Sequence, residues 1–448
     1  MNRSRLFFLV PILCLTLLEQ VGYSQSRTPL NVRTFGALGD STTKDTAAFQ
    51  KALDDCSAVG GGEVLVPAGN YLIGSIALKS NTTLRLEKDA NLMGSPDLDD
   101  YPIIKARWEG RWVDAHRALL SAQDAKNIAV VGAGKIAAHP DLGGRKMPRR
   151  PCVIEPINCT DVRLEDFSLQ QRHMWAIHPT YCENLLAKNL TIRTTETNGD
   201  GIDIDSCIHV RIEYCDIESG DDCIAVKSGR GMEGFRAAKT TEDVLISHCT
   251  LTGLMYACIG IGSESSGGIR NVRIEHCKLP SSAKFAIHIK SRVDRGAFID
   301  DLYFKDLEIG NAKGGFLRIN LTSTGIQDPE PVQGDEGIPS AKNYNFTDIK
   351  IDKCGTLVDA KGISPVKPLD GLTIENLSGT CRKGMTLVNI KHADLRGIHM
   401  EGFSGPLLST ANVTGAGLEG AVPFRPTAEP ATGSTATPNA GSEKTTGP

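Results

Sequence analysis

An apolar spacing that recurs eight times constrains the fold of this chain more than any other feature. Apolar residues occupy positions 0, +2, +5 and +7 of each copy, and successive copies begin 23 to 42 residues apart. Alternation with a period of two indicates strands, and a fixed strand unit with loops of varying length indicates a solenoid. The sequence therefore predicts an all-β fold, a right-handed parallel β-helix. The eight copies begin at Val162, Leu185, Val210, Val244, Val272, Leu302, Tyr344 and Leu372.

A second apolar frame follows the first and brings acidic residues into register. Aligning its copies places Asp200 and Asp222 in one column of neighbouring coils, with Asp221 beside them. Stacked strands lie about 4.8 Å apart, so the three carboxylates are expected to converge. Because strict alternation would turn Asp222 inward, this arrangement requires a bend just before Cys223. The copies begin at Ala176, Gly201, Cys223, Cys258 and Ala286.

Converging carboxylates suit the cleavage of a glycosidic bond. One carboxylic acid protonates the leaving oxygen while another carboxylate activates water. Two further columns of the second frame are expected to point outward, and Gly260 and Gly262 within them predict a hollow for a sugar ring. These columns are Asp203, Ala225, Gly260, His288 and Asp205, Lys227, Gly262, Lys290.

The two ends of the chain differ in composition from the repeats. Residues 1–24 predict a secretory signal peptide, because Arg3 and Arg5 precede an apolar run from Leu6 to Leu18. We expect residues 25–420 to form one β-helix domain and the Pro, Thr, Ala and Gly-rich residues 421–448 to be a disordered tail. The mature protein is then secreted or periplasmic, without membrane insertion, and is expected to be a monomer. A net charge of −4 offers no basic surface suited to nucleic acid.

Cysteines recur inside the first frame. Cys215, Cys249 and Cys277 occupy the same position of three copies and predict an interior stack of small apolar side chains. Removal of the signal peptide leaves 12 of the 13 cysteines in an oxidising compartment, where disulfides are possible. The spacing does not define a connectivity. His248 and His276 also match each other in the first frame, and we interpret them as surface residues rather than metal ligands.

The repeats and the acidic motif together resemble glycoside hydrolase family 28, the polygalacturonases and related pectin-degrading enzymes of the pectin lyase-like superfamily. The most specific motif is the segment 220–229, Gly-Asp-Asp-Cys-Ile-Ala-Val-Lys-Ser-Gly, which follows Asn198-Gly199-Asp200-Gly201. Weaker matches are segments 35–52 and 175–184. The resemblance implies that Asp221 is the general acid, that Asp200 and Asp222 hold and activate water, and that hydrolysis inverts the anomeric centre. It implies no cofactor and no metal.

Two positions depart from the pattern of the family. Tyr256 replaces the histidine of the usual Gly-His-Gly, and His288 replaces the arginine of Arg-Ile-Lys. An arginine can bind a galacturonate carboxylate through two hydrogen bonds, whereas histidine cannot. A rhamnogalacturonan-specific hydrolase therefore stands beside the polygalacturonase as an alternative, since such members of the family also depart near this histidine.

The remaining candidate residues would contact an acidic plant polysaccharide or oligosaccharide. Lys227 and Lys290 offer positive charge to a sugar carboxylate, with Tyr256 and His288 beside them. Trp175 either stacks on a sugar or forms part of the wall, and His178 is expected to line the groove.

Two other functional classes remain open. One is a calcium-dependent polysaccharide lyase, because clustered aspartates can bind Ca²⁺. The other is a carbohydrate-binding pseudoenzyme, suggested by the two departures. Exo or endo action depends on whether loops such as 229–241 or 322–340 block one end of the groove.

Overall fold

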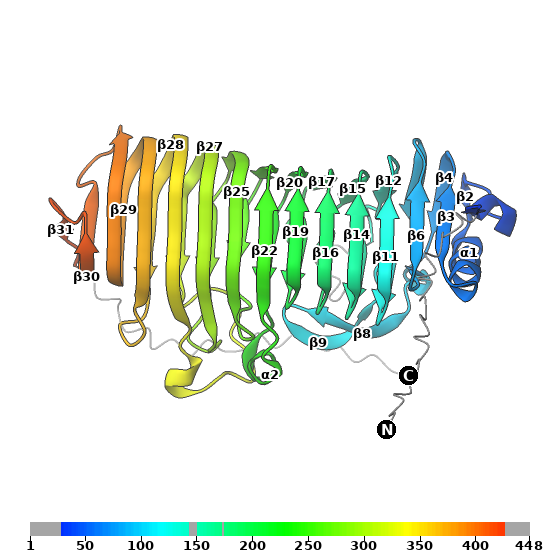
Figure 1. The fold of residues 1–448 in the computed structure, drawn as a ribbon, viewed down its shortest axis with the longest axis horizontal. Helices are drawn as coiled ribbons and strands as arrows, with labels where there is room; N and C mark the ends of the chain where they lie inside the picture. Colours follow the sequence, from blue (N-terminus) through cyan, green and yellow to red (C-terminus); the bar gives the residue numbers. More distant parts are fainter. Residues whose placement is uncertain (1–27, 143–149, 173, 426–448) are drawn as a thin grey trace, which may run out of the picture.

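The computed structural model describes residues 28–142, 150–172 and 174–425. Coils stack along one long axis, and parallel strands of successive coils lie side by side (Figure 1). Each coil presents strands to three faces, whose inward side chains fill one continuous core. The predicted right-handed parallel β-helix is confirmed. The expected signal peptide, residues 1–24, lies outside the described residues.

The three faces are built from short strands in the first two thirds of the chain. The first face contains β1 (Leu30–Asn31), β3 (Gly62–Val66), β6 (Thr82–Leu86), β11 (Lys126–Val131), β14 (Thr160–Glu165), β16 (Glu183–Lys188), β19 (Ile208–Glu213) and β22 (Thr241–Ser247). The second contains β2 (Asp40–Lys44), β4 (Gly69–Ile73), β7 (Ala90–Gly94), β12 (Lys135–Ala137), β15 (Ser168–Gln171), β17 (Thr191–Thr194), β20 (Asp216–Ser219) and β23 (Thr250–Gly253). The third contains β5 (Ile76–Ala77), β10 (Leu120–Gln123), β13 (Ile154–Ile157), β18 (Ile202–Asp205), β21 (Ile224–Lys227), β24 (Ile259–Ile261) and β26 (Phe285–Lys290).

Longer strands bend from one face to the next in the last third. They are β25 (Ile269–Ser282), β27 (Phe298–Asn320), β28 (Ser340–Gly362), β29 (Leu369–Glu401) and β30 (Leu408–Ala416). The second half of β27 pairs with β26, so it continues the third face. The columns of the second frame therefore continue on this face toward the C-terminal end.

The first frame has the predicted register along its whole length. Val162 pairs with Leu185, and the pairing continues copy by copy to Tyr344 and Leu372. The repeat also extends further toward the N-terminus than the sequence pattern shows, because Ile128 of β11 pairs with Val162. A hairpin inserted between β7 and β10, made of β8 (Ile103–Trp108) and β9 (Arg111–His116), interrupts the spacing there.

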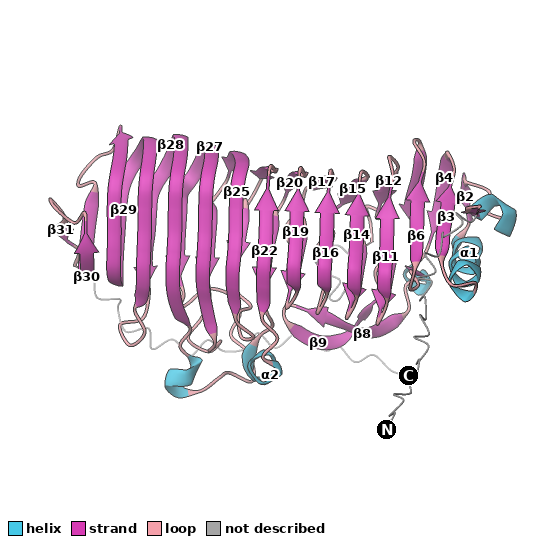
Figure 2. Cartoon of the chain, viewed as in Figure 1, coloured by secondary structure: helices cyan, strands magenta, loops and turns pink. Residues whose placement is uncertain are grey.

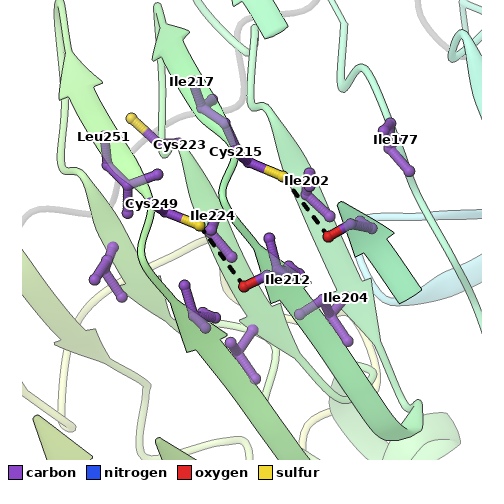
Figure 3. Packing of buried hydrophobic residues seen from close by; sticks show 14 of the residues in the cluster. Ile177, Ile202, Ile204, Ile212, Cys215, Ile217, Cys223, Ile224, Cys249 and Leu251 are labelled. Atoms are coloured by element: carbon purple, nitrogen blue, oxygen red, sulfur yellow. Dashed lines mark hydrogen bonds between the residues drawn. The ribbon is translucent and has the colours of Figure 1, made fainter. Parts of the chain in front are cut away.

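The cysteine stack is confirmed as part of the core. Figure 3 shows Cys215 and Cys249 among isoleucines of successive coils, with each thiol aimed at a backbone carbonyl oxygen. Cys277 continues the stack, and its side chain is also buried. All 12 cysteines of the described residues are buried free thiols, so burial of apolar surface and not cross-linking holds these coils together.

The ends of the solenoid are covered differently. Helix α1 (Thr46–Ala58) packs Phe49, Leu53 and Cys56 over the N-terminal coil, as a cap that shields the first open strand edge. At the other end β31 (Val422–Pro423) pairs with β30. The described residues extend to Arg425, and residues 426–448 of the expected tail lie outside them. None of the described helices is both long and apolar enough to cross a membrane.

The helical segments of the described residues lie at the N-terminal end and along one long edge (Figure 2). Besides α1, the N-terminal end has two short 3₁₀ helices, η1 (Val32–Phe35) and η2 (Leu98–Asp100). Along the edge lie α2 (Gly231–Ala237) and η3 (Gly334–Gly337), beside the β8–β9 hairpin (Figure 1). We call the hairpin, α2 and the loop containing η3 the side wall, because together they flank the third face.

Candidate active site

The three aspartates converge on the third face. Asp200 lies two residues before the start of β18, and Asp221 and Asp222 lie in the connection from β20 to β21. Backbone hydrogen bonds from Gly201 to Asp222 (3.0 Å) and from Asp221 to Gly199 (3.2 Å) hold the two coils in this register. One carboxylate oxygen from each aspartate lies within 4.8 Å of the others. The sequence prediction that these residues come together agrees with this geometry.

The required bend before Cys223 is present. The chain leaves strand geometry after Ser219, whose hydroxyl donates to the backbone oxygen of Asp221 (2.8 Å). Gly220 permits the turn, since a Cβ there would overlap the carbonyl oxygen of Glu196. Beyond the turn Cys223 returns to the core, while Asp222 is turned out of it.

The expected hollow at Gly260 and Gly262 is wrong. A Cβ at Gly260 would overlap the carboxylate of Asp222, and one at Gly262 would overlap the backbone oxygen of Lys290. The space created by Gly260 is therefore filled by a catalytic candidate and not left for a sugar. Glycine here permits Asp222 to lie flat over the neighbouring coil, where it is 1% exposed.

Two lysines compensate the buried negative charge. The Lys227 ammonium lies 2.7 Å from Asp203 and 3.9 Å from Asp200, and the Lys290 ammonium lies 2.6 Å from Asp222. Both lysines are mostly buried. The sequence pattern placed them as free charges for the substrate, but the structure commits each to an ion pair with an aspartate. Asp203, which the pattern aligned without giving it a role, is the main partner of Lys227.

Crowding changes the protonation of the cluster. Burial, reinforced by the charge of Asp222, raises the pKa of Asp221 to about 6. Burial, with the charges of Asp203 and Asp221, raises the pKa of Asp200 well above its usual value. Neighbouring carboxylates in a poorly solvated site cannot all ionise together, so the cluster retains a proton near neutral pH. This is the property that a general acid needs.

Tyr256 and His288 lie near Lys290, His288 on the same strand β26 and Tyr256 on the preceding coil. The Tyr256 ring is 5.1 Å from the Lys290 ammonium, and the Tyr256 and His288 ring centroids are 6.2 Å apart. Burial, with the charges of Lys290 and Arg318, lowers the pKa of His288 to about 2. The imidazole is therefore neutral, and its Nε2 has no hydrogen-bond partner among the described residues.

Trp175 and His178 are buried instead of facing solvent. Trp175 is 4% exposed, with the Lys227 ammonium 4.3 Å from its ring centroid and Trp108 packed against it at 5.8 Å. His178 is buried and bonds to Glu155 at 3.2 Å. Burial thus favours the wall interpretation of Trp175, and His178 is enclosed beside Glu155 and does not line an open groove.

The side wall covers residues that the sequence pattern placed outward. Arg107 of β8 is buried and binds Asp205 (3.2 Å) and Glu233 of α2 (3.1 Å). Asp205 and Lys227 are therefore enclosed, which corrects the expectation that their column faces solvent. These partners are 98 and 126 residues apart in sequence and follow no periodicity, so no sequence signal identified Arg107 or Glu233.

Ion pairs also fix the rest of the side wall. Arg111 and Arg230 both bind Asp328, at 2.9 and 3.0 Å, which joins the hairpin and α2 to the loop between β27 and β28. The two loops on which exo or endo action depends are thus held along one side of the third face.

Two clusters of the described residues have the composition of a metal site. One is Asp200, Asp221 and Asp222, and the other is the buried set of Cys152, Glu155 and His178. His248 and His276 belong to neither, and both lie at the surface as expected, His276 on Asp306 at 2.7 Å.

Comparisons with known proteins agree with this fold and identify a family. The family model described as glycosyl hydrolases family 28 matches residues 56–320. A "Probable polygalacturonase" of Vitis vinifera is 33% identical over 362 residues, which cover 77% of this chain and 72% of the relative. "Polygalacturonase-2" of Solanum lycopersicum is 23% identical over 369 residues, covering 78% and 74%.

Solved structures share the architecture. A family 28 exopolygalacturonase of Yersinia enterocolitica superposes with a TM-score of 0.72 at 20% identity, covering 87% of this chain and 78% of that one. A hyperthermoactive exopolygalacturonase of Thermotoga maritima gives 0.70 at 23% identity, covering 84% and 92%. At these identities the superpositions establish the fold, while the family model and the grapevine relative establish the family. The chain therefore belongs to glycosyl hydrolases family 28 and is a polygalacturonase-like glycoside hydrolase.

Proposed function

We propose that this enzyme hydrolyses the backbone of an acidic pectic polysaccharide, with Asp221 as general acid and with Asp200 and Asp222 holding and activating water. The observation that carries the proposal is the convergence of three carboxylates in which burial raises the pKa of Asp221 to about 6. The relatives named polygalacturonase support the substrate class. Export of the mature protein, suggested by residues 1–24, belongs to the same proposal.

The division of roles follows from the surroundings of each carboxylate. Asp221 is the least buried of the three and has no ion-pair partner among the described residues, so it can hold a proton and reach a glycosidic oxygen. Lys290 compensates the charge of Asp222, which suits a group that accepts a proton from water. Asp200 lies across from Asp222 in the same column and completes the water site.

We propose that hydrolysis inverts the anomeric centre. Inverting enzymes commonly separate their carboxyl groups by about 6.5–9.5 Å to accommodate water. The nearest oxygens here lie within 4.8 Å, so stereochemistry is a demanding test of the proposal. Proton NMR of the first-formed product should show the anomer opposite to the cleaved bond, and the retained anomer would overturn this step.

A rhamnogalacturonan backbone is the second candidate substrate, and His288 is the observation that favours it. The neutral imidazole lacks the charge with which an arginine would hold a galacturonate carboxylate. Reducing ends should be assayed on polygalacturonan and on rhamnogalacturonan in parallel, with and without a chelator. Faster cleavage of polygalacturonan supports the first candidate. An ultraviolet-absorbing unsaturated product that disappears with the chelator indicates a lyase, and binding of both polymers without cleavage indicates a pseudoenzyme.

The assignment of Asp221 as the general acid predicts how kcat falls on the alkaline side of the pH profile. Protonated Asp221 is the active form, so kcat should fall about tenfold per pH unit above about 6. Because the charge of Lys290 lowers the pKa of Asp221, Lys290→Gln should move this limb to higher pH. Lys278→Gln, which removes an exposed lysine paired with Glu308 at 3.4 Å, should leave the limb in place. A wild-type rate that is constant from pH 5 to 8 would contradict the assignment.

A further inference from the structure

The third face continues for several coils beyond the aspartates, and its character changes from acidic to basic. His288 pairs in register with Arg318 of β27, Arg318 with Asp359 of β28, and Asp359 with Thr386 of β29. In an adjacent column Thr356 pairs with Lys383. Arg318 lies three coils from Asp222, about 14 Å along the axis at the usual strand spacing.

A hollow of about 350 Å³ opens at this end of the face. Its lining is mostly polar and includes Asp359, Lys361, Lys383, Thr386, Ser404 and Ser409. These side chains come from β28, β29, the turn that follows β29, and β30, so neighbouring coils hold the hollow open. Unlike the space over Gly260, it is not filled by a side chain of any described residue.

The basic side chains here are incompletely neutralised. Arg318 is 42% exposed, and its nearest carboxylate is Asp359 at 3.9 Å, which is also held by Lys361 at 3.3 Å. Arg318 donates no hydrogen bond to any part of the chain that the structure describes, and exposed Lys383 has no ion pair there. Two cations therefore share Asp359 while Lys383 beside them has no ion pair among the described residues, whereas at the aspartate cluster two lysines compensate four aspartates.

This charge pattern specifies the ligand. The Arg318 guanidinium lies 5.8 Å from the centroid of the Phe285 ring, and its hydrogen-bond donors are not used by the described residues. A guanidinium favours a planar carboxylate, which it can bind through two parallel hydrogen bonds. An acidic sugar would be repelled by the aspartates and attracted by the basic end. The coil spacing lets one linear chain contact both.

We propose that Arg318 and Lys383 form a carboxylate-binding subsite for a uronate unit of the same polysaccharide, several sugars away from the bond that is cleaved. The inference rests on the proposed function and extends it, since it gives the polymer a direction from Asp221 toward the C-terminal coils. Arg318, one coil beyond His288, thereby supplies the charged contact to a sugar carboxylate that the neutral His288 does not supply.

The test is the dependence of binding on oligomer length. Calorimetry with the Asp221→Asn protein should show affinity for oligogalacturonates rising from trimer to octamer as the ligand reaches the hollow. In Arg318→Ala and Lys383→Ala proteins the octamer should lose about tenfold in affinity relative to the trimer, as expected for one charged contact. Arg163→Ala, a matched loss of an exposed arginine on the first face, should leave both affinities unchanged.

Two results would overturn the subsite. One is an unchanged length dependence in both variants, and the other is an equal length dependence with fully methyl-esterified oligomers, which carry no free carboxylate. Failure of the catalytic proposal looks different, because wild-type protein would then release no reducing ends from any pectic polymer, whatever the length dependence of binding.

Discussion

Replacing Asp221 by asparagine should lower kcat on the preferred pectic polymer by about 10²–10⁴-fold, the usual contribution of a general acid. The amide has nearly the same shape, and its oxygen can still accept one of the two backbone N–H groups that bond to separate oxygens of Asp221, from Asn198 (3.4 Å) or from Asp222 (3.1 Å). It cannot deliver the proton that the raised pKa of Asp221 retains. The expected change is therefore in kcat, with affinity for the oligosaccharide nearly unchanged.

The matched control is Asp216→Asn on β20. Asp216 is half exposed and bound to Arg193 at 2.7 Å, so the same chemical change there removes only a surface ion pair. Rates should be compared at pH 5 with thermal unfolding measured in parallel. An Asp221→Asn protein that folds normally and hydrolyses within a factor of three of wild type would refute the assignment of the acid.

Replacing Lys227 by methionine should destabilise the fold by about 3–5 kcal/mol, the usual cost of removing one partner of a buried ion pair. Methionine fills most of the volume over Trp175, so the loss is mainly electrostatic. Asp203, whose carboxylate is fully buried, would keep its charge without its 2.7 Å partner, and Asp200 would lose a cation at 3.9 Å.

The deficit of Lys227→Met should depend on pH in a defined direction. Burial already raises the pKa of Asp203 above its ordinary 3.8, and Lys227 opposes that rise. Without Lys227 the folded-state pKa rises further. A raised folded pKa contributes stability below the unfolded value that is lost as the pH increases, so the deficit should shrink toward pH 4 and be largest at neutral pH.

Lys278→Met provides the comparison for this experiment. Lys278 is 66% exposed and pairs with Glu308 at 3.4 Å, an arrangement that contributes about 0–1 kcal/mol. Chemical denaturation at pH 4.5 and 7 should separate the two variants clearly at pH 7 only. Equal stabilities of the two variants at pH 7 would show that Lys227 does not compensate the buried aspartates.

The solenoid and its register were predictable because they depend on local alternation. An inward residue at every second position is needed to bury a strand, so the eight copies beginning at Val162 align correctly from spacing alone. The same rule places Asp200 beside Asp222 and explains why Cys215, Cys249 and Cys277 are packing residues. The inserted hairpin interrupts the spacing, and the N-terminal coils were missed for that reason.

The surroundings of the aspartates were not predictable in the same way. The spacing of the repeats assigns a side chain to a column, but it does not show how deeply other segments of the chain bury that side chain. Gly260 illustrates this. The absence of a side chain there predicts an open space, but the sequence does not show that the Asp222 carboxylate fills that space. Lys227 is another case, since its pairing with Asp203 depends on the enclosure of both residues.

The sequence by itself determined the parallel β-helix, the family, and the three aspartates that meet on neighbouring coils. These follow from a one-dimensional repeat, in which residues at equal positions become neighbours in space. The tertiary structure decided the burial of Trp175 and His178, the commitment of both lysines to aspartates, and the basic hollow beyond Arg318. The burial and the ion pairs arise because Arg107 and the rest of the side wall fold across the third face. The basic hollow arises because charged residues of separate coils lie next to one another. Long-range contacts of this kind have no period for the sequence to display.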